Sequence, residues 1–220
     1  MDPRSFGPSG WIFFHRFPYL FPNEILSKKE AIIALRFIIF FIDLLPCENC
    51  KNNSKMILKD YPIWNNITKK LNGKYIITRY NLFKWTHEFH NRVNRDIGNN
   101  ENINLWKYED NLLKHQYENS IFMFLFSICQ VYYKTEELKY KIFFNNIIPS
   151  LIPKFSLLLE SIPLTNGCFI KKNYLLRWLY DIYLIFFKKD VIDTWTFGDL
   201  SLLLDAFTSK NNTCQIKCSI

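Results

Sequence analysis

The stretch LLPCENC (Leu44–Cys50) decides the fold, because it ends one helix and begins the next. Pro46 has no N–H to donate, so it cannot continue the apolar helix that precedes it. The residues from Cys47 to about Lys59 are then predicted to form a new helix, with both cysteines in its first turn. Free backbone N–H groups and the helix dipole stabilise a thiolate at such a position. The Cys-x-x-Cys pair therefore indicates redox or metal chemistry.

Helix signals dominate the chain around this stretch, and strand alternation is weak. Ser27 and Glu30 form a capping box ahead of a long apolar run. The predicted helices are Trp11–Phe17, the run from Ser27 to Leu45, Cys47 to about Lys59, Asn81–Ile97 with Gly98 as its C-terminal cap, and Asn104 to about Tyr117. Four helices and a short fifth, joined by modest loops, predict an all-α fold built on a four-helix bundle.

The second half of the chain is also helical in pattern and very apolar. We divide the sequence into a first domain at 1–118, a helical accessory domain at 119–207 and a polar, flexible tail at 208–220. Segments of the accessory domain echo the first half in the same order: 158–168 resembles 42–50, 173–178 resembles 80–85, and 195–200 resembles 106–112. A degenerate second copy of the bundle is one hypothesis, and chance similarity between apolar helices is the alternative.

Composition excludes several classes of protein. A hydrophobic content of 49% is that of a globular chain and excludes global disorder. The net charge of +8 is spread along the sequence, and neither a basic stripe nor a reading motif indicates nucleic acid binding. The N-terminal residues lack the apolar region of a signal peptide. The longest apolar stretch, Ala31–Leu45, is too short to span a membrane.

A polar stripe marks the helix predicted at Asn81–Ile97. Its members recur at spacings of three and four and share one face: His87, His90, Asn91 and Asn94. In an otherwise apolar bundle, ligand contact explains such a stripe better than a purely structural network. Thiols pass electrons to oxygen slowly, so thiol oxidation beside this stripe would need an organic cofactor, and a flavin is the usual one.

Several motifs carry a resemblance to a known family. They are GPSGWIFFH (Gly7–His15), LPCENC (Leu45–Cys50), WTHEFHNRVN (Trp85–Asn94) and WKY (Trp106–Tyr108). Over residues 5–117 the chain resembles the Erv/ALR family of FAD-linked sulfhydryl oxidases. Within that family it looks most similar to the small members carried by large cytoplasmic DNA viruses. The resemblance implies a helical bundle that commonly forms a homodimer.

The resemblance also implies a role for each matching residue. Cys50 would lie against the flavin as the charge-transfer thiolate, and Cys47 would exchange disulfides with incoming thiols. The residues implied to bind FAD are Gly7, Trp11, His15, His87, His90, Asn91, Val93, Asn94, Trp106 and Tyr108. Protein thiols, including those of a thioredoxin-like carrier, would become disulfides while oxygen becomes hydrogen peroxide. For a viral member, the host cytoplasm or the virion would be the location.

The remaining four cysteines have less specific surroundings. Cys214 and Cys218 form a Cys-x-x-x-Cys in the tail. A second, flexible cysteine pair often shuttles electrons in the family, so the resemblance implies a shuttle here, with two incidental surface cysteines as the alternative. Cys129 and Cys168 lie in apolar segments and are predicted to be buried thiols.

Three other classes of protein compete with the oxidase. Zinc could use Cys47, Cys50, His87 and His90, but the His-x-x-His spacing fits zinc-finger patterns poorly, and we predict no metal site. A thioredoxin-like oxidoreductase would need a βαβ pattern around the cysteine pair, and none is visible. The serious alternative is a non-enzymatic virion assembly or interaction protein on an oxidase-like scaffold.

Overall fold

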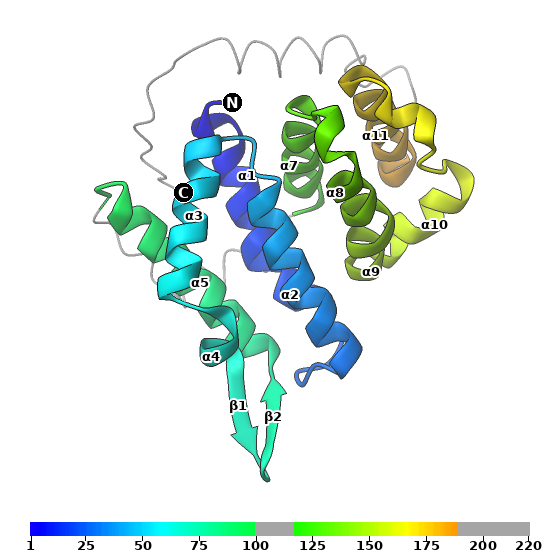
Figure 1. Cartoon of the computed structure of the whole chain (residues 1–220). Helices are drawn as coiled ribbons and strands as arrows, with labels where there is room; N and C mark the ends of the chain where they lie inside the picture. The colour runs from blue at the N-terminus through cyan, green and yellow to red at the C-terminus, as the bar shows by residue number, and fades with distance from the viewer. Residues whose placement is uncertain (100–116, 189–220) are drawn as a thin grey trace.

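The computed structural model describes residues 1–99 and 117–188, and these are mostly helical (Figure 1). The first range contains α1 (Pro3–Arg16), the 3-10 helix η1 (Phe17–Leu20), α2 (Lys28–Asp43), α3 (Glu48–Asp60), α4 (Ile63–Ile67), β1 (Thr68–Leu71), β2 (Lys74–Ile77) and α5 (Arg79–Asp96). The second contains α7 (Glu118–Gln130), η2 (Lys134–Glu136), α8 (Glu137–Ile142), the π-helical turn η3 (Phe143–Ile147), α9 (Ile148–Leu151), α10 (Pro153–Ser161), η4 (Asn166–Phe169) and α11 (Lys172–Phe187).

The helix ends follow from local capping chemistry. The capping box of α2 is present as predicted: the Glu30 N–H donates to Ser27 Oγ at 3.3 Å, and the Ser27 N–H donates to Glu30 Oε2 at 2.7 Å. The helix ends at Asp43, ahead of Pro46, which confirms the predicted stop. Gly98 follows α5 with a φ of 76°, and its N–H donates to the Arg95 carbonyl at 3.1 Å.

The hairpin of β1 and β2 was not predicted, and it corrects the all-α assignment. The two strands pair antiparallel, with Leu71 opposite Lys74. Asn72 and Gly73 connect them with φ angles of 48° and 78°. A two-residue turn with positive φ at both positions matches the right-handed twist of the strands and favours Asn-Gly. The hairpin projects from the helices at the bottom of Figure 1 and places no residue in the cavity described below.

Both described ranges contribute to one hydrophobic core. In Figure 1, α1 and α2 lie between α3 and α5 on one side and α7 to α11 on the other. Helix α7 packs against α1, and the Phe124 ring stacks on Phe41 with 4.6 Å between ring centroids. A Cβ atom built on Gly10 of α1 would lie 3.0 Å from the Phe124 ring, so glycine permits this close approach. The division at residue 118 and the second-copy hypothesis stay predictions.

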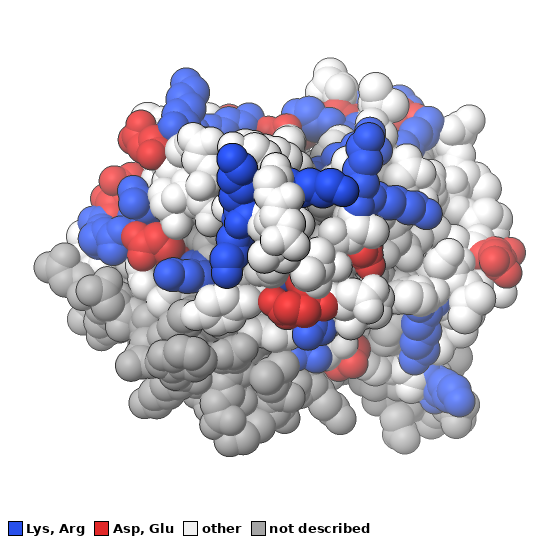
Figure 2. Space-filling model, turned by 90° about the horizontal axis from the view of Figure 1, so that it is seen from below, with Lys and Arg blue, Asp and Glu red and all other residues white. Residues whose placement is uncertain are grey.

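Charged side chains are distributed over the surface. In Figure 2, which views the molecule from the hairpin end, acidic side chains lie between several of the lysines and arginines. Within residues 1–99 and 117–188, no helix has both the length and the apolar character to cross a membrane.

Candidate functional site

The cysteine pair lies at the start of α3, where the sequence placed it. Cys47 is the N-cap residue, and the Cys50 N–H donates to Cys47 Sγ at 3.2 Å. The two sulfurs form a disulfide, with 5.2 Å between the Cα atoms. Nearby lysines are paired: Lys51 with Glu48 at 3.3 Å and Lys55 with Asp43 at 2.7 Å. The N-terminus of α3 adds positive potential beside the sulfurs.

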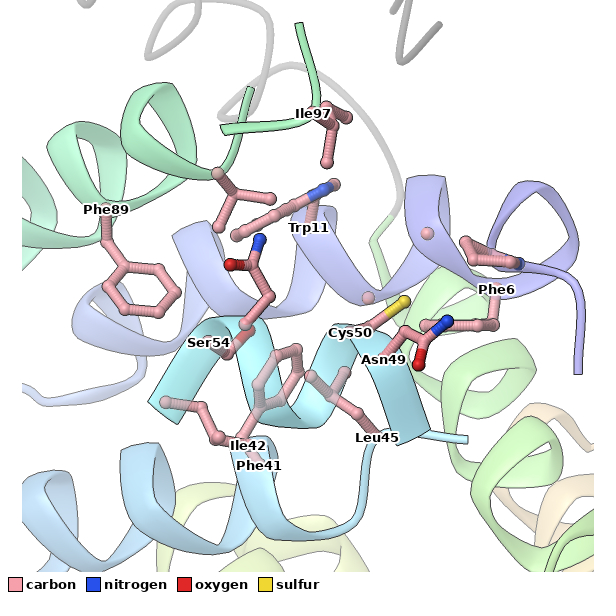
Figure 3. Close-up of a pocket in the computed structure, with 15 residues that line it drawn as sticks. Phe6, Trp11, Phe41, Ile42, Leu45, Asn49, Cys50, Ser54, Phe89 and Ile97 are labelled. Atoms are coloured by element: carbon pink, nitrogen blue, oxygen red, sulfur yellow. The ribbon is translucent and has the colours of Figure 1, made fainter. Parts of the chain in front are cut away.

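A cavity of about 250 Å³ opens beside Cys50. Figure 3 shows the Cys50 sulfur pointing from α3 toward α1, with Trp11, Phe89 and Ile97 on the far wall. The cavity is lined by Pro3, Phe6, Gly7, Gly10, Trp11, Phe41, Ile42, Leu45, Asn49, Cys50, Asn53, Ser54, Phe89, Val93 and Ile97. Most of these side chains are apolar, and the few polar ones come from α3. Such a lining suits a flat, largely apolar ring system placed next to one sulfur.

A buried pair of histidines stands behind one wall of the cavity. The Trp11 ring stacks on His90 with 3.7 Å between ring centroids and 11° between ring planes. His90 Nδ1 lies 2.9 Å from His15 Nε2, and His15 Nδ1 lies 3.1 Å from the Thr86 hydroxyl. Both histidines are fully buried. This network joins α1 to α5 and holds the Trp11 ring against the cavity.

The structure brings only some of the predicted cofactor residues to the cavity. Gly7, Trp11 and Val93 line it, while His15 and His90 lie one layer behind Trp11. The other polar members of the α5 stripe are buried but do not line this cavity: His87, Asn91 and Asn94. Trp106, Tyr108, Cys214 and Cys218 lie outside the described residues. The cofactor roles of all these residues stay predictions.

Two groups of site residues were missed in the sequence. Asn53 and Ser54 follow Cys50 by three and four positions, so helical spacing alone could have placed them on the same face. Phe89, Val93 and Ile97 form a second, apolar face of α5 at spacings of four, next to the polar stripe. Only Val93 of these three was predicted, because an apolar face is common to most helices of a bundle and does not by itself indicate a ligand.

The free cysteines follow the prediction in part. Cys129 is fully buried, and burial raises the pKa of its thiol well above the usual value, which makes it a poor nucleophile. Cys168 is only partly buried, in η4, with its sulfur 3.7 Å from the Thr165 hydroxyl. Neither sulfur lines the cavity beside Cys50.

The buried histidines predict a loss of stability in mild acid. Burial, with a smaller effect of neighbouring histidines, lowers the pKa of His90 to about 3 and holds the pKa of His15 well below its usual value. The unfolded chain binds protons near the ordinary histidine pKa of about 6.5, so it takes up more protons than the folded chain below that pH. The free energy of unfolding should fall as the pH falls, by about 1.4 kcal/mol per pH unit for each histidine.

Urea unfolding between pH 7 and pH 5 measures this loss. The carboxyls with shifted pKa values are Asp2, Glu30 and Glu137. Their pKa values are lowered from 3.8, 4.5 and 4.5, so they titrate below this window. A stability that does not change between pH 7 and pH 5 would contradict the assignment of neutral, buried histidines.

Comparisons with known proteins identify relatives of this chain. The chain is 31% identical over 101 residues to a probable FAD-linked sulfhydryl oxidase of Acanthamoeba polyphaga mimivirus, a match that covers 44% of this chain and 62% of the mimivirus protein. It is 29% identical over 113 residues to an FAD-linked sulfhydryl oxidase of African swine fever virus (isolate Pig/Kenya/KEN-50/1950), covering 49% of this chain and 83% of the viral protein. No solved structure matches the chain.

The family comparison covers the part of the chain that holds the cysteine pair and most of the residues that line the cavity. The profile of the Erv1 / Alr family matches residues 8–118. That segment includes Trp11, the Cys47–Cys50 disulfide and all of α5. The chain therefore belongs to the Erv1 / Alr family.

Proposed function

We propose that this protein is an FAD-dependent thiol oxidase that forms disulfides in protein substrates. One observation carries the proposal: the disulfide at the start of α3 has one sulfur, that of Cys50, in an apolar cavity that Trp11 also lines. The viral relatives are named for the same activity and cofactor. We also propose that the protein forms a homodimer and that Cys214 and Cys218 of the tail shuttle electrons to the Cys47–Cys50 pair.

The residues present fit the cofactor. The apolar lining of the cavity suits the flat isoalloxazine ring, and Trp11 offers an aromatic face. Behind the wall, His90 Nε2 is buried without a hydrogen-bond partner among the described residues, and so are both amide atoms of Asn94. Buried polar atoms are nearly always satisfied in folded proteins, so these atoms indicate a polar ligand. Bound FAD would supply the chemistry that accepts an electron pair from thiols and passes it to oxygen.

The cysteines divide the thiol exchange between them. A substrate thiolate attacks Cys47 Sγ, the disulfide between Cys47 and Cys50 breaks, and Cys50 leaves as a thiolate at the cavity. A second substrate thiolate attacks the substrate sulfur bound to Cys47 and releases Cys47 as a thiolate. The substrate is then a disulfide, and its electron pair rests on the Cys47 and Cys50 thiols. Cys50 suits the inner role because it lines the cavity and Cys47 does not.

The absorption spectrum of the purified full-length protein tests the proposal. We expect the flavin band at about 450 nm, because a flavin is the cofactor that lets thiols reduce oxygen. Oxygen consumption and hydrogen peroxide release should follow the addition of a dithiol. A protein that binds no FAD and consumes no oxygen would contradict the proposal and favour the non-enzymatic assembly role.

The tail cysteines give a separate prediction. If Cys214 and Cys218 shuttle electrons to Cys47, then replacing both by serine should slow the oxidation of a reduced protein substrate. Oxidation of a small dithiol should keep its rate, because a small molecule reaches Cys47 without a carrier. Oxygen electrode rates with the two substrates measure the difference. Equal rates for the variant and the wild type on the protein substrate would remove the shuttle role.

A further inference from the structure

One ring nitrogen of the histidine pair behind the cavity has no hydrogen-bond partner in the part of the chain that the structure describes. His90 is 0% exposed, and its Nε2 atom has no hydrogen-bond partner within residues 1–99 and 117–188. Its other ring nitrogen is satisfied by His15 at 2.9 Å. His90 lies behind Trp11 and does not itself line the cavity. The protonation of Nε2 therefore decides whether a ligand that reaches this nitrogen past Trp11 must donate or accept a hydrogen bond.

Thr86 fixes the positions of the protons in this network. A hydroxyl has one proton, and that of Thr86 is donated to the Phe83 carbonyl at 2.8 Å. The same hydroxyl oxygen can then only accept from His15 Nδ1, which lies 3.1 Å away. His15 thus carries its proton on Nδ1.

The direction of donation in this hydrogen-bond network continues from His15 to His90. A neutral imidazole has one N–H, so His15 Nε2 is an acceptor and His90 Nδ1 must donate to it. Burial keeps the pKa of both histidines low, so neither ring carries a second proton near neutral pH. With its proton on Nδ1, His90 presents a bare lone pair at Nε2.

We propose that Thr86 is a positioning residue: it fixes the direction of the hydrogen bonds from Thr86 through His15 to His90. It thereby makes His90 Nε2 an acceptor for an N–H or O–H group of the bound ligand. The proposal rests on the proposed function and deepens it: the ligand is FAD, and the group that donates the hydrogen bond to His90 Nε2 belongs to FAD. Trp11 contributes because it stacks on the His90 ring and lines the cavity beside Cys50. The Trp11 ring thereby holds the plane of the imidazole, and Thr86 sets its tautomer.

Thr86→Val tests the direction, because valine has nearly the shape of threonine but no hydroxyl. His15 Nδ1–H would then lose the acceptor that the Thr86 hydroxyl supplies, which is costly at a fully buried position. The favourable response is a reversal of the hydrogen-bond direction. His15 then donates from Nε2 to His90 Nδ1, and His90 carries its proton on Nε2. The acceptor becomes a donor. Thr86→Ser is the matched control, because serine retains the hydroxyl.

Nitrogen chemical shifts of the full-length protein labelled with ¹⁵N-histidine report the tautomers without reference to activity. In the wild type and in Thr86→Ser, Nε2 of His90 should give the shift of an unprotonated nitrogen. In Thr86→Val it should give the shift of a protonated one. A protonated Nε2 in the wild type overturns the proposal, and this measurement decides it even if Thr86→Val does not fold.

The affinity for FAD gives the second readout, through quenching of flavin fluorescence. Thr86→Val should weaken FAD binding about tenfold, the effect of losing one hydrogen bond, while Thr86→Ser stays within about twofold. Unchanged affinity in a folded Thr86→Val protein overturns the proposal. A wild type that binds no FAD contradicts the proposed function instead, and the nitrogen shifts separate that outcome from this one.

Discussion

Cys50→Ser is expected to abolish dithiol oxidation while the protein stays folded and keeps its affinity for FAD. The sulfur of Cys50 is the one that lines the cavity, so under the proposed function its loss removes the group that connects the exchange at Cys47 to the cofactor. Removing a member of such a covalent unit lowers turnover by roughly a thousandfold or more. Serine is close in size to cysteine, and Cys50 is only partly buried, so the cost to folding is small.

Two measurements separate a loss of electron transfer from a loss of cofactor. Without oxygen, a dithiol should bleach the flavin of the wild type, whereas the flavin of Cys50→Ser should stay bound and oxidised. Cys168→Ser is the matched control, because Cys168 is a partly buried free thiol away from the cavity. Substantial oxygen consumption by Cys50→Ser would show that the route of electrons does not pass through the disulfide at the start of α3.

Phe124→Ala is expected to destabilise the protein by about 3–5 kcal/mol, the range for removing a large aromatic side chain from a core. Phe124 is 0% exposed and touches the face of α1 where Gly10 leaves room for its ring. It also stacks on Phe41, which lines the cavity. The resulting void would therefore loosen α1 and α2 beside Cys50, and FAD binding should weaken as well.

Met123→Ala on the same helix is the control for this effect. Met123 is 38% exposed, so its truncation removes little buried surface and should cost less than about 1 kcal/mol. Urea unfolding followed by circular dichroism measures both variants. If the two destabilise equally, α7 does not belong to the core that supports the cavity.

The sequence predicted the parts of the fold that depend on local chemistry. Three such features are the capping box at Ser27, the stop ahead of Pro46 and the glycine after α5. Each depends on only a few neighbouring residues, so each could be predicted from the sequence alone. The early start of α1 had a signal that was missed: Asp2 accepts from the Arg4 N–H at 2.9 Å, and Pro3 takes the first helical position. The hairpin had one too, since Asn72 and Gly73 are a strong turn pair.

The parts that could not be predicted depend on contacts between distant residues. Thr86 has no distinctive neighbours in the sequence, and its role exists only because α1 brings His15 to within 3.1 Å of its hydroxyl. The packing of Phe124 on Phe41 joins residues far apart in the chain, and no local pattern encodes it. For the candidate site, residue types indicated the chemistry, but only the fold showed which side chains share the cavity and which lie behind it.

The contact between α7 and α1 sets a lower limit on the size of a stable, working fragment. The family match ends at residue 118, the first residue of α7, so a fragment trimmed to that match would lose the helix that covers Gly10, Phe13 and Phe41. Those aromatic faces would then meet water, and an exposed apolar patch of this kind favours aggregation. Expression of the family-matched segment alone should therefore yield an insoluble product, whereas fragments that retain α7 and the helices packed on it should stay in solution.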